Sequence, residues 1–484
     1  MRHEFERNIG FRYAIDLLEP ASPYGRAKIA GLRFFSPDER PELERQLQNV
    51  VRTLHHLAPL APEYEKISLY MMPLKDIRRS VEMCREAALS ETELFELKRF
   101  CLQSVLISPV FARIRDASGI EGIDIRAQEE ALGLLDPENA RAATFFLPDA
   151  SSKALLAIRK EKRALEEKLR RAADRDERAR LMAERAAVAA REDVEESRLR
   201  AEICEGLRPH IDGILRCMDG IANFDFTLAR AKLAAAYGGC AVEFSRNEVE
   251  FVDMRNPRVA DALKERGGNF TPVSISAGPG AALITGANMG GKSVALKTLA
   301  LNALLVKAGL LPFAKSARLP LFEEISLVAE DGEDVGRGLS SFGAEIVRFN
   351  EMLSRALRAK GVCLLLLDEF ARGTNPEEGA LIARAVTRRL NGLPHVGVLT
   401  THYDGVARYA KLHYEVAGLR DMDVAAVARE IAANRGDGVR VIARHMNYGL
   451  YRAQGRESCP RDARNVCMLL GMDAEILKDI AAQE

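Results

Sequence analysis

Residues 281–297 read AALITGANMGGKSVALK, and this stretch decides the fold. The apolar residues 281–284 are typical of a buried strand, glycines follow at once, and the apolar spacing after Ser293 is that of a helix. Strand, glycine-rich loop and helix in this order fit the pattern G-x-x-x-x-G-K-[ST] in the context that the pattern requires. Glycines let backbone N–H groups converge on phosphate oxygens, and the helix turns its positive N-terminus toward them. We therefore predict a site for a nucleoside triphosphate.

The polar residues of this loop have separate expected roles. Lys292 is expected to reach the β- and γ-phosphates, and the Ser293 hydroxyl is expected to bind Mg²⁺. A glycine-rich turn with a chance lysine is the alternative, and it is disfavoured because a strand and a helix flank the loop in the right order. The predicted phosphate-binding residues are Gly286, Ala287, Asn288, Met289, Gly290, Gly291, Lys292 and Ser293.

A second stretch, residues 362–369, reads VCLLLLDE. A continuous apolar run of this length is typical of a strand buried on both faces. Asp368 is predicted to lie beside the phosphate loop and to hold Mg²⁺ directly or through water, and Glu369 to polarise the attacking water. Two carboxylates after a strand are more often an ordinary solvated turn. The phosphate loop upstream is what favours the catalytic interpretation.

The composition describes a soluble, core-forming protein. The 484 residues suggest roughly two to four domains, and 47% of them are hydrophobic. Lys plus Arg and Asp plus Glu each number 70, so the net charge gives no overall support for a nucleic-acid or membrane partner. The eight cysteines form no C-x-x-C pair, which argues against a zinc cluster and favours a reducing, cytoplasmic location. No run of about 18 apolar residues and no targeting signal occurs, so we expect no membrane association.

The first half of the chain is predicted to be helical. Residues 1–150 are expected to form a helical core domain, with a capping box at Ser90 and Glu93. Residues 149–205 contain no Gly or Pro and carry apolar residues seven apart, so a long helical arm and lever is expected over 151–240. One unbroken helix and a hairpin bent near 173–176 both remain compatible with this pattern.

The arm is balanced in charge. Residues 159–205 carry 14 Lys or Arg and 13 Asp or Glu. An arm that grips DNA should be basic, because it neutralises phosphates. The balance therefore favours a solvated structural arm, or a coil over 151–205 that contacts a protein partner.

Beyond about residue 240 strands alternate with helices, which predicts a mainly parallel sheet. The expected fold class is therefore α followed by α/β. An all-helical core and lever with a long coiled segment precedes a phosphate-loop domain over 241–445, and C-terminal helices occupy 446–484.

Four motifs, GANMGGKS, GLSSFGAEI, LLLLDEFARGT and TTHY, stand in this order along the second half. In order and spacing they resemble the ATPase domain of the MutS family, a P-loop domain of the ABC type, over about residues 245–445. Upstream, FDFTLARAKLA at 224–234 is similar to the core and lever helices of that family. The pattern is nearest the paralogue class that lacks a mismatch-reading domain and normally ends in a Smr nuclease domain. About forty residues follow 445, too few for such a nuclease domain.

The resemblance implies ATP and Mg²⁺ as cofactors, with Asp368 and Glu369 as the magnesium and water-activating carboxylates. It implies that His402 senses the γ-phosphate. A signature at Ser340, Ser341 and Phe342 would reach the nucleotide of a partner subunit, which implies a homodimer with composite sites. Residues 446–484 are similar to the dimerising helices of the family.

Other positions are matched less closely. Phe270 and His445 resemble the pair that sandwiches adenine, which is a stacking role. Ala287 and Val294 replace the usual Pro and Thr of the family. Both replacements are tolerable, because neither position must supply a phosphate or metal contact.

Two functions follow from the resemblance. The first is a DNA-associated ATPase in which nucleotide opens and closes a dimeric clamp, without a mismatch-reading or nuclease domain. The second is an ATP-dependent remodeller that acts on a partner protein, for example a reactivator of a cobalamin-dependent aminomutase. An inactive scaffold is disfavoured, because Lys292, Asp368 and Glu369 are all present.

Overall fold

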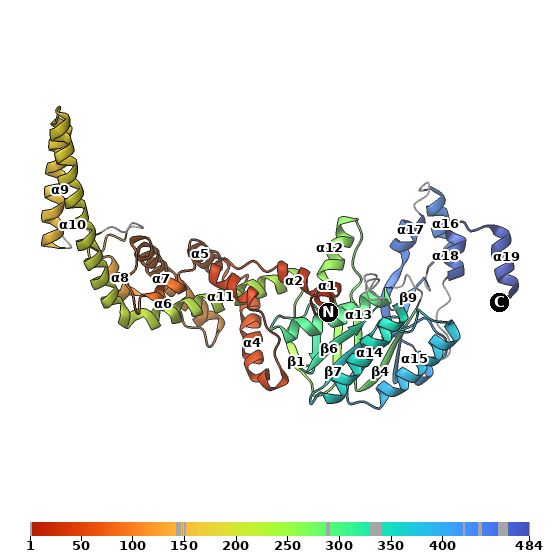
Figure 1. The fold of residues 1–484 in the computed structure, drawn as a ribbon. Coiled ribbons are helices and arrows are strands. Elements are labelled where there is room, and N and C mark those ends of the chain that lie inside the picture. Colours follow the sequence, from red (N-terminus) through yellow and green to blue (C-terminus); the bar gives the residue numbers. More distant parts are fainter. Residues whose placement is uncertain are drawn as a thin grey trace. The chain divides into compact units, whose positions relative to one another are not determined.

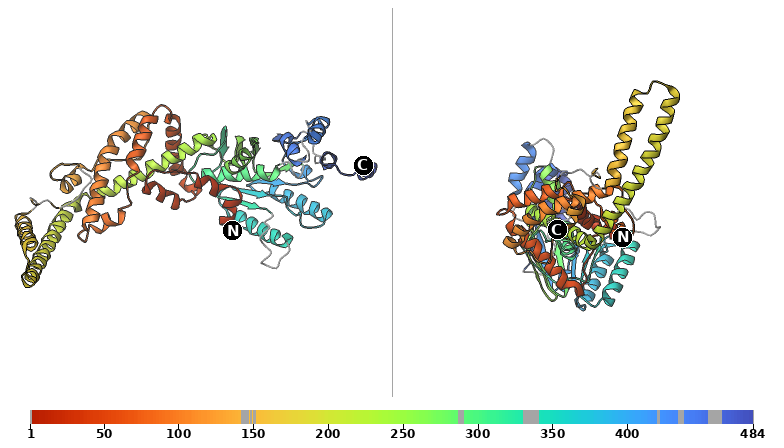
Figure 2. Two further views of the ribbon diagram at one scale, coloured as in Figure 1. Left: turned by 90° about the horizontal axis from the view of Figure 1, so that it is seen from above. Right: turned by 90° about the vertical axis from the view of Figure 1, so that its left-hand side faces the viewer.

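The computed structural model describes residues 2–141, 147, 149, 152–286, 291–329, 341–419, 422–433, 438–453 and 463–483. The chain packs into two units (Figures 1 and 2). Unit 1 comprises Met1–Leu18, Leu32–Leu54 and Arg230–Glu484, and unit 2 comprises Glu19–Gly31 and His55–Ala229. The boundary between Ala229 and Arg230 falls inside helix α11 (Ile211–Tyr237). No helix among the described residues is long and apolar enough to span a bilayer.

Unit 2 is helical. Its core surrounds Phe224 of α11, whose ring lies 5.1 Å from that of Phe111 and 6.4 Å from that of Tyr64. Helix α7 begins with the predicted capping box, since Ser90 Oγ accepts from Glu93 N and Glu93 Oε2 accepts from Ser90 N. The described helices of unit 2 besides α11 are α3 (Pro23–Ala30), α5 (Ala61–Met71), α6 (Arg78–Met83), α7 (Glu91–Ser118), α8 (Glu129–Leu135), α9 (Lys153–Arg171) and α10 (Arg175–Leu207).

Helices α9 and α10 form an antiparallel hairpin, so the second of the two compatible arrangements is the one found (Figure 2). Asp174 starts α10 by accepting a hydrogen bond from Glu177 N at 2.9 Å. The heptad positions Ile158 and Leu165 pack against Val188 of the returning helix. The turn between the two helices thus lies close to residues 173–176, where the sequence allowed a bend.

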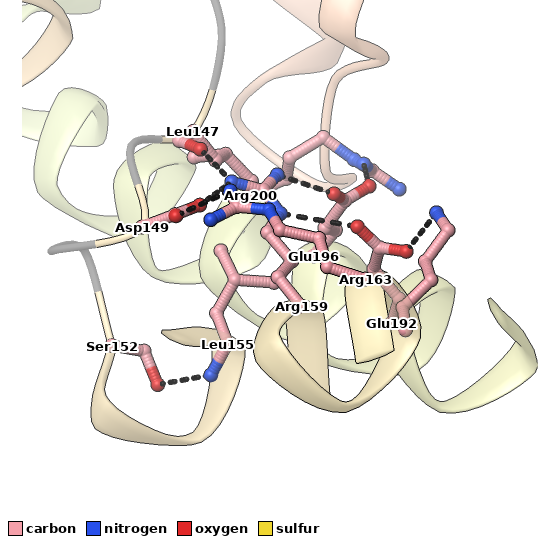
Figure 3. Close-up of polar contacts among 10 residues, drawn as sticks. Leu147, Asp149, Ser152, Leu155, Arg159, Arg163, Glu192, Glu196 and Arg200 are labelled. Carbon is pink, nitrogen blue, oxygen red and sulfur yellow. Dashed lines mark hydrogen bonds and ion pairs between the residues drawn. The ribbon is translucent and has the colours of Figure 1, made fainter. Parts of the chain in front are cut away.

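The base of the hairpin is tied by Arg159, whose side chain is 19% exposed (Figure 3). Its guanidinium donates to Asp149 Oδ1 at 2.9 Å, Glu192 Oε1 at 3.0 Å and Glu196 Oε1 at 2.8 Å. Ser152 Oγ donates to Glu195 across the same pair of helices. Many of the opposite charges of the arm thus pair with one another within the hairpin.

Unit 1 contains two sheets. The larger has the order β10-β9-β4-β8-β7-β6, parallel throughout except for β10, and the smaller has the order β1-β5-β2-β3. Helices α14 and α15 pack on one face of the larger sheet (Figure 1). The strands are β1 (Val242–Phe244), β2 (Val249–Met254), β3 (Val273–Ala277), β4 (Gly280–Thr285), β5 (Ser316–Leu319), β6 (Glu324–Val328), β7 (Cys363–Leu367), β8 (Val396–Thr400), β9 (Leu412–Gly418) and β10 (Asn447–Arg452).

Among its described residues, unit 1 also contains helices. They are α1 (Arg2–Asn8), α2 (Phe11–Asp16), most of α4 (Arg40–His56), the end of α11, α12 (Pro257–Glu265), α13 (Lys292–Lys307), α14 (Ser341–Arg358), α15 (Pro376–Asn391), α16 (Val424–Ala433), α17 (Gly438–His445), α18 (Ala463–Leu469) and α19 (Ala474–Gln483).

Strands β4, β7 and β8 are buried at every residue, and the apolar runs at β4 and β7 predicted this burial for those two strands. Strand β8 lies between β4 and β7 and is parallel to both. The carboxyl ends of these three strands therefore meet at one edge of the sheet, where open α/β sheets bind their ligands.

Candidate functional site

Three segments converge at the carboxyl edge of the larger sheet. The glycine-rich loop and Lys292 follow β4, Asp368 and Glu369 follow β7, and His402 lies two residues beyond the end of β8. The sequence predicted each of these segments separately. The sheet order brings them together.

Lys292 is the first residue of α13 and is only 2% exposed. Its Nζ donates to Gly286 O at 2.8 Å and lies 3.3 Å from Glu369 Oε1. Gly291, just before the helix, has φ of +82°, a conformation that suits glycine. A buried ammonium at a helix N-terminus provides the positive charge that a polyphosphate needs.

Asp368 is 9% exposed, and two hydroxyls hold its Oδ1 atom. Ser293 Oγ and Thr400 Oγ1 each donate to that atom at 2.8 Å. Ser293 comes from α13 and Thr400 from β8, so the carboxylate links both neighbouring segments. A carboxylate beside a serine hydroxyl is the oxygen donor set that Mg²⁺ takes beside phosphates, so the residues present fit this ion.

Glu369 has an unusual backbone with φ of +48°, which is uncommon for a residue other than glycine. Its N–H donates to Thr400 Oγ1 at 2.8 Å. Its two carboxylate oxygens face two cations, Lys292 at 3.3 Å and Arg372 at 2.9 Å. The carboxylate is 14% exposed, so it reaches solvent while its backbone is fixed.

His402 lies beside this group of charges. Burial lowers its pKa below the ordinary 6.5, Glu369 opposes the shift, and the positive charges of Lys292 and Arg372 add to it. Its Nδ1 is buried and has no hydrogen-bond partner among the described residues. An imidazole held neutral, with one ring nitrogen left over, is suited to a further hydrogen bond with a ligand.

A cavity of about 340 Å³ adjoins Lys292 and Ser293. Its volume is at the lower end of the range for small-molecule pockets. The aromatic side chains on its wall are Phe270 and Tyr448. Its lining residues are Val259, Leu263, Phe270, Thr271, Val273, Gly291, Lys292, Ser293, Val294, Glu369 and Tyr448.

The two residues predicted to stack on adenine lie in different surroundings. Phe270 lines the cavity, whereas His445 is absent from its lining and has Nε2 at 2.7 Å from Glu430 Oε2. Tyr448, which no sequence motif indicated, lines the cavity, and a Cβ on Gly291 would lie 2.9 Å from its Cδ1. The available signal was an aromatic three residues beyond His445, on a strand that flanks the sheet.

Several predicted residues lie outside the described part of the chain. These are Ala287, Asn288, Met289, Gly290 and Ser340. The backbone of Ser341 begins α14, and Phe342 packs against the core cluster between α14, α15 and the sheet. The predicted contact of this segment with a second subunit remains a prediction.

Comparisons with known proteins cover the part of the chain that contains this site. Residues 282–462 match the family model described as MutS domain V. The chain is 25% identical over 405 residues to a protein named Endonuclease MutS2 of Symbiobacterium thermophilum, covering 82% of this chain and 46% of the relative. It is 32% identical over 296 residues to a protein named DNA mismatch repair protein MutS of Anaeromyxobacter sp., covering 58% of this chain and 31% of the relative. The chain thus spans less than half of the length of either relative.

Proposed function

Because the chain belongs to the MutS family, we propose that it is a dimeric, DNA-associated ATPase in which ATP binding and hydrolysis drive its helical unit. One observation carries this proposal. A buried lysine, a hydroxyl and two carboxylates from separate segments converge beside a largely apolar cavity, namely Lys292, Ser293, Asp368 and Glu369.

The phosphates are held at the start of α13. Lys292 exchanges its contact with Glu369 for phosphate oxygens, and backbone N–H groups of the glycine-rich loop supply further donors. The base enters the cavity beside Phe270 and Tyr448, where an aromatic face favours stacking.

Mg²⁺ fits the oxygen atoms of Ser293 and Asp368, which already lie 2.8 Å apart. When bound, the ion neutralises charge on the phosphate oxygens. Thr400 keeps the Asp368 carboxylate oriented through its own 2.8 Å hydrogen bond. The Ser293 hydroxyl therefore serves binding of the ion, and the Thr400 hydroxyl serves orientation of the carboxylate.

Glu369 orients the attacking water and accepts its proton. Release of Lys292 to the phosphates leaves the Glu369 carboxylate available to that water, while the Thr400 hydroxyl continues to hold its backbone. His402, kept neutral by burial, donates a hydrogen bond to the γ-phosphate, and loss of that phosphate on hydrolysis removes the contact.

The last part of the proposed cycle is the closure of a dimer and the transmission of that closure to the helical unit. Residues 340–342 of each subunit approach the nucleotide of the other, so that two composite sites close together. Helix α11 contains the boundary between the two units and is the natural element to transmit closure. The cargo is proposed to be DNA, in keeping with the printed name of the mismatch-repair relative.

The catalytic part is tested by measuring ATP hydrolysis by the full chain with Mg²⁺. We expect Glu369→Gln to lower kcat by about 10²–10⁴-fold, the usual size of a general-base contribution, while ATP still binds. Glu351→Gln, an exposed substitution on α14, is the matched control. A wild-type chain without hydrolysis, or a Glu369→Gln variant with unchanged kcat, would contradict the proposal.

The DNA part needs its own measurement. Binding of homoduplex, mismatched and branched DNA is followed by fluorescence anisotropy between about 50 and 200 mM salt, where phosphate contacts weaken steeply. Absence of binding at the low salt concentration rejects DNA as the cargo. The relatives described above carry no name that points to the remodelling alternative.

A further inference from the structure

Helix α12 (Pro257–Glu265) forms one wall of the cavity. Val259 and Leu263, four residues apart and therefore on one face of the helix, both line it. Asp261 lies midway between them in sequence, so its side chain leaves the helix on the side away from the cavity. The helix thus has a ligand-facing side and an anchored side.

One carboxylate oxygen of Asp261 accepts hydrogen bonds from two tyrosine hydroxyls. Tyr13 Oη of α2 donates to Asp261 Oδ2 at 2.8 Å, and Tyr237 Oη, at the last residue of α11, donates to the same atom at 2.6 Å. Hydrogen bonds to an ionised acceptor are stronger than those between neutral groups. The hydrogen bond to Asp261 raises the pKa of Tyr13 above its ordinary value of 10.0.

The N-terminal helices hold α12 at two more points. Asn256 Nδ2, at the N-cap, donates to Ile9 O at 3.1 Å, and an Arg258 guanidinium nitrogen donates to Arg7 O at 2.7 Å. The turn that permits this is Gly10, with φ of +88° and a Cβ position only 3.0 Å from Asn256 Oδ1. Segments about 250 residues apart in sequence are therefore joined along one side of α12.

A helix of nine residues is too short to be stable by itself. Its position, and with it the position of Val259 and Leu263, depends on these tethers. Among them Asp261 is the only one that connects α12 to both α2 and α11 through described hydrogen bonds.

We propose that Asp261 is a positioning residue for the base-binding half of the nucleotide site, acting through Tyr13 and Tyr237 to hold the α12 wall against the nucleoside. This inference rests on the proposed function, because it takes the cavity to receive the base of ATP. It assigns to the N-terminal helices, far from the phosphate loop in sequence, a part in nucleotide affinity. If Asp261 is replaced, we expect weaker binding of the nucleoside part of ATP, whereas the phosphate contacts of Lys292 stay intact.

The test compares two ligands of the full chain, ATP and inorganic tripolyphosphate, by calorimetry with Mg²⁺. We expect Asp261→Ala to weaken ATP binding about tenfold, the size expected for losing hydrogen bonds to a charge, and to leave tripolyphosphate within about twofold. The KM for ATP should rise with kcat at saturation unchanged. Asp261→Asn, which keeps an acceptor oxygen, should recover most of the affinity.

Tyr13→Phe removes one hydroxyl only and should weaken ATP binding in the same direction. Lys264→Ala, an exposed substitution on the same helix, is the matched control. The inference is overturned if Asp261→Ala and Tyr13→Phe both bind ATP as the wild type does, or if both ligands are weakened equally. A wild-type chain that binds neither ligand would remove the proposed function and the inference together, whereas wild-type ATP binding with unaffected variants removes the inference alone.

Discussion

Ser293 Oγ donates to Asp368 Oδ1 over 2.8 Å, although the two residues are 75 positions apart and follow different strands. The contact exists because β8 separates β4 from β7 by a single strand position, so that the residues beyond both strands reach across its end. It leaves two oxygen atoms from separate segments at one point. That is the geometry a small divalent cation requires beside a polyphosphate.

Removal of the Ser293 hydroxyl tests this pairing. We expect Ser293→Ala to raise the Mg²⁺ concentration needed for half-maximal ATP hydrolysis by about tenfold, because losing a ligand of that kind costs on the order of 1.4 kcal/mol. Ser316→Ala, exposed on β5, serves as the control. An unchanged Mg²⁺ requirement would place the metal elsewhere.

Substitutions of Tyr448 and His445 should differ in their effect on ATP binding. Tyr448→Ala should weaken ATP binding about three- to tenfold, because an aromatic contact is worth roughly 0.5–1.5 kcal/mol beyond its buried area. His445→Ala should bind ATP as the wild type does, since its ring faces Glu430. Titration with a fluorescent ATP analogue distinguishes the two. A loss in His445→Ala alone would restore the stacking role expected from the sequence.

The lowered pKa of His402 gives a pH dependence with a defined sign. The folded protein disfavours the imidazolium, so His402 contributes stability above its ordinary pKa of 6.5, and that contribution is lost as the pH falls below 6.5 toward the lowered value. The difference in urea midpoint between pH 7.5 and pH 5.5 should therefore be smaller in His402→Gln than in the wild type.

An NMR titration of the His402 ring, assigned with the same variant, gives the pKa directly. The chain unfolded in urea is the reference. A folded-state pKa equal to or above the unfolded value would contradict the effect of burial described above.

Arg159 should dominate the stability of the α9–α10 hairpin. Its removal leaves three carboxylates without their shared cation, and we expect Arg159→Ala to lower the local stability by about 1–3 kcal/mol. Arg171→Ala is the matched control, because Arg171 is 78% exposed and pairs with Glu167 within a single helix. Hydrogen exchange over residues 153–207 measures both. Equal protection in the two variants would show that the network contributes little.

The charged half of the candidate site could be predicted from sequence because its signals are local. Lys292 and Ser293 directly follow a glycine-rich loop, and Asp368 and Glu369 directly follow an apolar run. In each case the strand that positions the side chains is adjacent in sequence. Only the order of the strands, which places them together, required the structure.

The cavity beside these charges could not be predicted in the same way. Tyr448 reaches the cavity because β10 is added antiparallel beside β9, a pairing that no local pattern specifies. The contact of Tyr13 with Asp261 spans 248 positions and involves a helix of six residues. Such long-range contacts of short elements leave no periodic trace in a single sequence.

The helical half was predictable in kind but not in arrangement. The heptad spacing indicated a coiled segment and residues 173–176, three of them charged, were compatible with a bend, yet an unbroken helix satisfied the same spacing. The hairpin is selected by pairs between the two helices, such as Ile158 with Val188 and Arg159 with Glu192, whose partners are 30 or more residues apart.

The hairpin leaves and re-enters its unit at neighbouring points, where Ser152 meets Glu195. Insertion or deletion of matched turns beyond that junction would change the reach of the arm without disturbing the anchorage below it. Its length is thus a parameter that natural variation can tune independently, and a chimera that exchanges only the outer turns should fold as readily as the parent.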